Sequence, residues 1–81
     1  LMYQKNTSYF LDKYYKKGGD FNTYIPMEEI REHYHKWCID NDIPEDSENA
    51  LARELTYRKI PNDRIQIDGE YIYIRRYIER I

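Results

Sequence analysis

Six polar or basic side chains that suit nucleic-acid contacts cluster between residues 49 and 59. They are Asn49, Arg53, Thr56, Tyr57, Arg58 and Lys59. The first three stand at positions i, i+4 and i+7 and share one face of a helix. Asn and Arg recognise adenine and guanine edges in the major groove of DNA, and the last four residues suit phosphate contacts at the end of the helix and beyond it. The pattern favours a DNA-binding face, although a mixed polar face is also usual on any exposed helix.

A second group of arginines and tyrosines flanks Asp68-Gly69, a strong signal for a two-residue hairpin turn. With this turn, Ile67 pairs with Glu70, Gln66 with Tyr71, Ile65 with Ile72, and Arg64 with Tyr73. One face then carries isoleucines 65, 67, 72 and 74, which we expect to turn inward. The other face carries Arg64, Gln66, Tyr71, Tyr73 and Arg75. Tyrosines between arginines can stack on bases or lie along a phosphate backbone, and the same pattern fits ordinary cross-strand packing.

Motifs for catalysis, cofactors or metals are not recognisable. Gly18-Gly19 lacks the following lysine of a phosphate-binding loop. His33, His35 and Cys38 project in different directions from a helix, so three ligands do not converge on one ion. We therefore expect a non-enzymatic domain without a cofactor, a metal or a small-molecule substrate.

Composition limits the chain to one small domain. Its 81 residues are 41% hydrophobic, with a net charge of −2 and a single cysteine. The apolar runs are too short to span a membrane, and a lone cysteine suits a reducing, intracellular compartment such as a cytoplasm. Because the chain begins with Leu1 and not with Met, we expect a fragment of a longer protein.

Charge is distributed unevenly along the chain. Residues 1–19 hold four lysines and one aspartate, a balance of +3. Residues 20–48 hold nine acidic and two basic residues, a balance of −7, and residues 49–81 carry +2. A polarised surface of this kind can bind a polyanion on one side while the whole molecule stays acidic.

Apolar periodicity predicts three helices. The first runs from Asn6-Thr7-Ser8, which can cap it, to about Lys17, where Gly18-Gly19 ends it. The second spans about 26–41, with a buried stripe of Met27, Ile30, Tyr34, Trp37 and Cys38. The third spans about 47–58, capped by Asp46 or Ser47, with Leu51 and Leu55 in the core.

Residues 21–25 form a predicted short strand between the first two helices, and residues 76–81 fit either a strand extension or a helix. The order is helix, strand, helix, helix and hairpin. This order predicts an α+β winged-helix domain, whose third helix and hairpin wing face DNA.

The segment Ile25-Pro26-Met27-Glu28-Glu29-Ile30, followed by Tyr34, Trp37 and Cys38, resembles a known pattern. It is similar to the C-terminal winged-helix domain of the helicase–primase replication proteins of poxviruses, phages and plasmids. The resemblance covers residues 7–75 and extends to Arg53 and Leu55. It implies a DNA-contacting or protein-docking accessory domain that follows a ring-forming ATPase. Carried onto this chain, it implies contacts from Asn49, Arg53, Thr56, Lys59, Arg64, Arg75 and Arg76.

Two functions follow as hypotheses. The first is a DNA-binding accessory domain of a replication protein, contacting phosphates of single- or double-stranded DNA. The second is a protein-docking module of the same protein, in ring assembly or partner recruitment, since the −7 stretch of residues 20–48 can meet a basic partner. A free-standing transcription regulator is a weaker alternative, because a dimerising helix is not recognisable.

Overall fold

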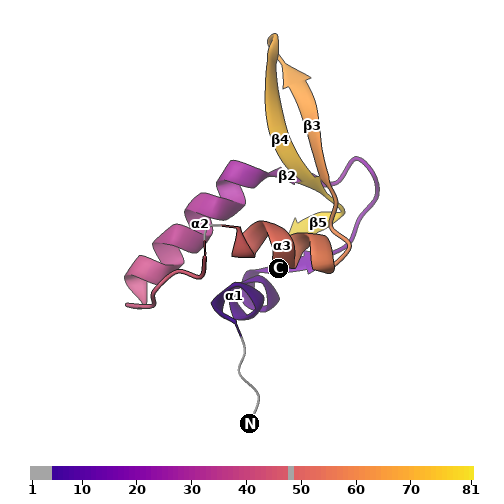
Figure 1. Ribbon diagram of the computed structural model, residues 1–81. Helices are drawn as coiled ribbons and strands as arrows, with labels where there is room; N and C mark the ends of the chain where they lie inside the picture. The colour runs from indigo at the N-terminus through magenta and orange to yellow at the C-terminus, as the bar shows by residue number, and fades with distance from the viewer. Residues whose placement is uncertain (1–4, 48) are drawn as a thin grey trace.

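Three helices and five short antiparallel strands make up the computed structural model, which describes residues 5–47 and 49–81 (Figure 1). The helices are α1 (Asn6–Tyr14), α2 (Met27–Asp40) and α3 (Ala50–Tyr57). The strands are β1 (Tyr15–Lys17), β2 (Tyr24–Pro26), β3 (Asn62–Ile67), β4 (Glu70–Arg76) and β5 (Ile78–Arg80). The α+β class is as predicted, but β1 and β5 add two strands to the three that were expected. Glu48, inside the predicted third helix, lies outside the described residues.

The main sheet has the strand order β2-β4-β3, and β1 pairs with β5 in a separate two-stranded sheet. All four predicted hairpin pairs are confirmed, from Ile67 opposite Glu70 to Arg64 opposite Tyr73. Asp68 and Gly69 have φ values of 51° and 82°, so both central turn positions are left-handed, as a type I′ turn requires.

The core forms where α1 and α2 meet. The predicted stripe of α2 is confirmed, since Met27, Ile30, Tyr34, Trp37 and Cys38 are all buried. Phe10 of α1 is fully buried, and its ring centroid lies 5.2 Å from that of Tyr34 and 5.4 Å from that of Trp37. Leu51 and Leu55 of α3 close this cluster, as predicted.

The first helix is shorter than predicted, because it ends at Tyr14 and the chain continues as β1. Tyr15 is extended (φ −135°, ψ 158°), and its buried ring packs beside Phe10. The C-terminal strand β5 supplies the pairing partner, with Tyr15 opposite Arg80. Long-range pairing therefore overrides the local helical pattern at residues 15–17. It also settles the tail, which is a strand after a sharp bend at Tyr77 (φ 61°).

The predicted caps are wrong. Lys5, just before Asn6, is the N-cap residue of α1, and Asn49 is that of α3; neither makes a side-chain capping bond. Asp46 instead accepts a hydrogen bond at Oδ2 from the backbone N–H of Thr7 (3.0 Å), so it caps α1 from a distant loop. Because α3 begins only at Ala50, Asp46 is too far ahead in sequence to cap it.

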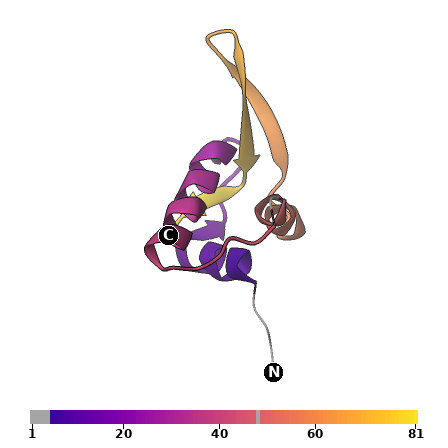
Figure 2. The same ribbon diagram turned by 60° about the vertical axis from the view of Figure 1, so that its left-hand side comes forward.

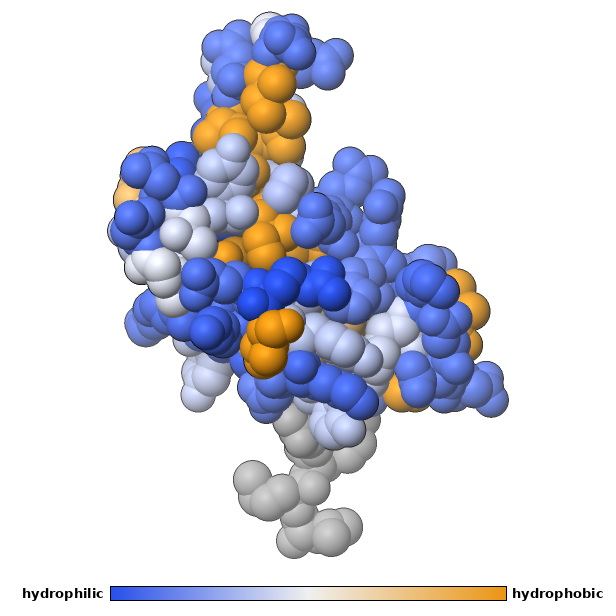
Figure 3. Space-filling view, turned by 180° about the vertical axis from the view of Figure 1, so that it is seen from behind, coloured by the Kyte–Doolittle hydropathy of each residue, from blue (hydrophilic) through white to orange (hydrophobic). Residues whose placement is uncertain are grey.

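The β3–β4 hairpin projects from the rest of the molecule (Figures 1 and 2). Only Ile74, at its base, is fully buried; Ile65 and Ile72 are half-buried and Ile67 is 46% exposed. The expectation that all four isoleucines turn inward is therefore wrong, because most of the hairpin extends beyond the core. Figure 3 shows the resulting apolar strip along the hairpin.

Candidate nucleic-acid interface

The exposed face of α3 forms a shallow depression. Asn49, Ala52, Arg53, Thr56 and Tyr57 line it. The Nη2 of Arg53 donates to Ser47 Oγ (3.1 Å), and Tyr57 is 82% exposed. The spacing that predicted a shared polar face is confirmed, since Asn49, Arg53 and Thr56 are all exposed.

A second depression lies next to the first, since Thr56 lines both. Lys17, Thr56, Lys59, Pro61 and Tyr77 surround it. Lys17 comes from β1, a strand absent from the prediction, so sequence reasoning missed it as a member of this surface. Its only signal was the basic balance of residues 1–19. Two lysines distant in sequence flank one hollow, which suits an anionic group.

Lys59 occupies a special position at the end of α3. Its φ of 65° is left-handed, and its N–H donates to Thr56 O (3.0 Å). The N–H of Ile60 donates to Leu55 O (3.0 Å), and both of these side chains are buried. These two bonds form a Schellman motif, which usually places glycine where Lys59 stands. The motif holds the Lys59 backbone at the rim of the second depression.

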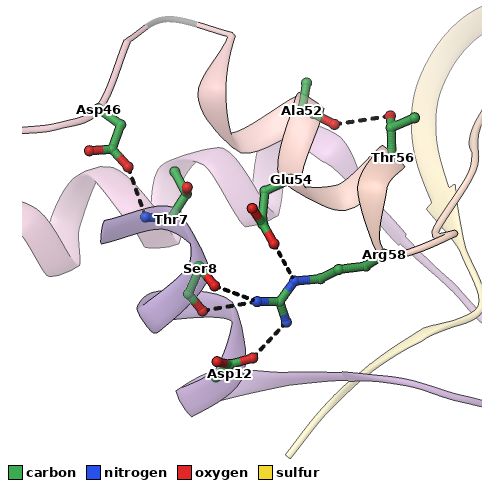
Figure 4. A network of polar contacts seen from close by, with 8 residues as sticks. All are labelled: Thr7, Ser8, Asp12, Asp46, Ala52, Glu54, Thr56 and Arg58. Atoms are coloured by element: carbon green, nitrogen blue, oxygen red, sulfur yellow. Dashed lines mark hydrogen bonds and ion pairs between the residues drawn. The ribbon is translucent and has the colours of Figure 1, made fainter. Parts of the chain in front are cut away.

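Arg58 was predicted to contact phosphates but turns back onto α1 (Figure 4). Its Nε lies 3.0 Å from Glu54 Oε2, and its Nη1 lies 2.8 Å from Asp12 Oδ1. Its Nη2 donates to both the carbonyl and the hydroxyl oxygen of Ser8, each at 3.1 Å. With its guanidinium occupied by two carboxylates, Arg58 joins α1 to α3 and does not face the depressions.

Arg75 was expected on the open face of the hairpin but is buried. Its Nη1 donates to Thr56 Oγ1 (3.0 Å) and to Ile60 O (3.1 Å). Burial and, to a smaller degree, the charge of Arg31 lower the pKa of Arg75. The cause of the burial is the third strand, because Ile25 of β2 lies directly opposite Arg75 and brings the body of the domain onto β4.

Arg76 is likewise buried, on the opposite face of β4. Its Nε donates to Asp63 Oδ2 (2.6 Å), and its Nη1 donates to Phe21 O (2.7 Å). The guanidinium also lies 3.9 Å from the centroid of the Phe21 ring. The hydrogen bond from Arg76 lowers the pKa of Asp63. The prediction that Arg75 and Arg76 form an open cationic surface is therefore wrong.

Arg64 and Tyr73 remain exposed on the hairpin, as predicted. The Arg64 guanidinium lies 4.4 Å from the centroid of the Tyr71 ring, and Tyr71 and Tyr73 are each 59% exposed. Alternate residues of a strand share a face, so these tyrosines leave β4 on the side from which Arg75 reaches Thr56. The arginine–tyrosine face of the hairpin thus lies on the same side as α3.

The histidines and the cysteine are placed apart. His33 Nδ1 lies 2.8 Å from the Tyr15 hydroxyl, and burial followed by the Arg80 charge lowers the pKa of His33. His35 pairs with Glu45 at 2.9 Å, and Cys38 is buried. Within residues 5–47 and 49–81, no three His, Cys, Asp or Glu side chains are grouped to hold a metal ion.

Comparisons of the chain with protein-family models, with curated proteins and with solved structures give no match. In the part of the chain that the structure describes, no helix has the length and apolar character needed to cross a membrane.

Proposed function

We propose that this chain is a winged-helix DNA-binding domain without catalytic activity. Three features support the assignment: the element order, the pairing of β2 onto the second hairpin strand, and the projecting hairpin, which serves as the wing. In such domains the helix before the hairpin faces DNA, and here that helix is α3. The domain contacts the phosphate backbone and makes few contacts to bases.

One observation carries the proposal. The two depressions share Thr56, and the arginine–tyrosine face of the hairpin lies on their side. Four exposed cations lie on this side of the molecule: Lys17, Arg53 and Lys59 line the depressions, and Arg64 lies on the arginine–tyrosine face of the hairpin. Tyr57 and Tyr73 add exposed rings that can stack on bases or pack against sugars.

The salt dependence of DNA binding tests this proposal. Four phosphate contacts predict a log–log slope of about −3.6 for duplex DNA and about −2.8 for a single strand. Fluorescence anisotropy with labelled single- and double-stranded oligonucleotides measures both. Removing two contacts with R53A/K59A reduces the duplex slope to about −1.8. Absence of salt-sensitive binding at micromolar protein refutes the proposal.

A matched control removes the same charge elsewhere. Lys36 is exposed on α2, and Figure 2 shows α2 and α3 on different sides of the hairpin base. Lys16 is exposed on the face of β1 opposite to that of Lys17. The K16A/K36A variant has the same net charge as R53A/K59A. Its slope stays at the wild-type value if the α3 surface holds the DNA, and an equal loss in both variants contradicts that location.

The family resemblance suggests the setting of this domain. We propose that it is an accessory domain of a helicase–primase replication protein, positioned beside a ring-forming ATPase. Its contacts then hold the DNA template, while the ATPase supplies the energy of ATP hydrolysis.

A docking module of the same replication protein is the second candidate. Glu28, Glu29 and Glu32 are exposed on α2, which gives this helix an acidic surface that repels DNA and can meet a basic protein face. Reversing these charges with E28K/E29K/E32K then abolishes partner binding or changes ring assembly while DNA binding is retained. Unchanged assembly and partner binding exclude this function.

A further inference from the structure

The outer edge of β3 is a second surface, which shares only Arg64 with the surface that we propose for DNA binding. β3 is the last strand of the β2-β4-β3 sheet, and no other strand of the described residues pairs with its outer edge. Ile67 and Glu70 flank the two-residue turn and exchange hydrogen bonds with each other. By alternation, Gln66 and Arg64 direct their backbone groups away from β4.

Only part of the usual protection of an open edge is present in β3. Proteins protect such edges with charged side chains, proline or a bulge; β3 carries the charged Asp63 and Arg64, but its register is continuous from Asn62 to Ile67, with no proline and no bulge. One local contact exists, since the Arg64 N–H donates to Asp63 Oδ1 (2.8 Å). The same strand presents Ile65 and the 46% exposed Ile67 to the apolar strip of the hairpin (Figure 3). The edge therefore offers both backbone pairing and an apolar surface.

We propose that a second copy of this chain pairs its β3 antiparallel with this edge. Charge complementarity selects the register centred on Gln66. In that register Arg64 lies opposite Asp68 of the second copy, and Ile65 lies opposite Ile67 of the second copy. Two-fold symmetry repeats each contact. A register centred on Ile65 sets Arg64 opposite Gln66 and forms no charge pair.

The resulting dimer joins two three-stranded sheets and makes one apolar strip continuous across the axis. The central Gln66 pair exchanges two backbone hydrogen bonds, since its outward groups face each other. The Ile65–Ile67 pairs fall at non-hydrogen-bonded positions, where facing side chains approach most closely. An interface this small belongs to weak, concentration-dependent association.

Sedimentation velocity on the 81-residue chain without DNA, from micromolar to millimolar concentration, measures this dimer. Gln66→Pro removes the outward N–H without touching the bonds to β4, so it blocks association and leaves circular dichroism unchanged. Gln66→Thr retains the N–H and the dimer, and is the matched control. A wild-type chain that stays monomeric, or a dimer that survives Q66P, overturns the proposal.

Mixing two variants tests the register. R64D sets two carboxylates opposite each other across the dimer axis, and D68R sets two guanidinium groups opposite each other. Each variant alone therefore associates about tenfold more weakly than wild type. In a heterodimer of the two variants, the carboxylate introduced by R64D lies opposite the guanidinium introduced by D68R. The native Asp68 of the first variant lies opposite the native Arg64 of the second. Both pairs of this heterodimer are opposite in charge, so it forms with wild-type affinity.

A mixture that associates no better than either variant overturns the register. Failure of these experiments leaves the DNA proposal intact, because no DNA is present.

Discussion

Replacing Lys59 by glycine should raise stability while it weakens DNA binding. The left-handed backbone at Lys59 (φ 65°) costs an L-residue about 1–2 kcal/mol, which glycine avoids. Glycine also adds freedom to the unfolded chain, worth about 0.4–1 kcal/mol in the opposite direction. The midpoints of these ranges leave a net gain of about 0.8 kcal/mol, or about 3–6 °C in Tm for a domain of this size.

The same substitution removes one cation from the rim of the second depression. The slope of duplex binding against salt should fall from about −3.6 to about −2.7. K59A is the matched control, since it loses the same charge but keeps a β-carbon in the left-handed conformation. Both variants should show the same change in slope, and only K59G should gain stability. A lower Tm for K59G, or an unchanged slope for both, refutes this account of Lys59.

Three further predictions concern stability. R58A should destabilise the domain by about 2 kcal/mol in urea unfolding, because it leaves the partly buried Glu54 carboxylate unpaired, whereas R53A should change stability by less than about 0.5 kcal/mol. The hydrogen bond from Arg76 lowers the pKa of Asp63, so the Asp63–Arg76 pair stabilises the fold above pH ~4, and this stability is lost as the pH falls toward the lowered pKa. D63N should therefore make the free energy of unfolding less dependent on pH in acid. Burial lowers the pKa of His33, so stability should fall as pH drops through ~6.5, and the NMR titration midpoint of His33 should lie below that value.

Local chemistry explains which parts of the fold could be predicted. The Asp68-Gly69 turn fixed the hairpin register, because both residues accept left-handed backbone and a one-residue slip would mix the two faces. The buried stripe of α2 could be predicted from helical periodicity alone, because its apolar residues recur at helical spacing and so identify the side of the helix that is buried. Both signals act over a few residues, so no knowledge of distant partners was needed.

Errors arose where distant segments meet. The helical pattern at Tyr15 was outweighed by β5, which lies more than sixty positions away in sequence. Lys17 reaches the second depression through the same pairing, so no local pattern could assign it there. Asp46 caps α1 rather than α3 for a similar reason, because the loop between α2 and α3 returns to the start of α1.

The arginines of this chain differ in whether protein oxygen atoms already accept hydrogen bonds from their guanidinium groups. Arg58 and Arg76 meet carboxylates, and Arg75 meets a carbonyl and a hydroxyl oxygen at the base of the hairpin. A guanidinium held in this way gains little from a phosphate, because it must first give up these hydrogen bonds. The Nε of Arg75 has no partner among the described residues, so burial, and not full pairing, keeps this guanidinium from a phosphate. Arg53 contacts only a serine hydroxyl and Arg64 an aromatic ring among the contacts found in residues 5–47 and 49–81, so both charges remain available. Counting basic residues in the sequence therefore overestimates the surface that we propose for DNA binding, and the salt slope measures the smaller set.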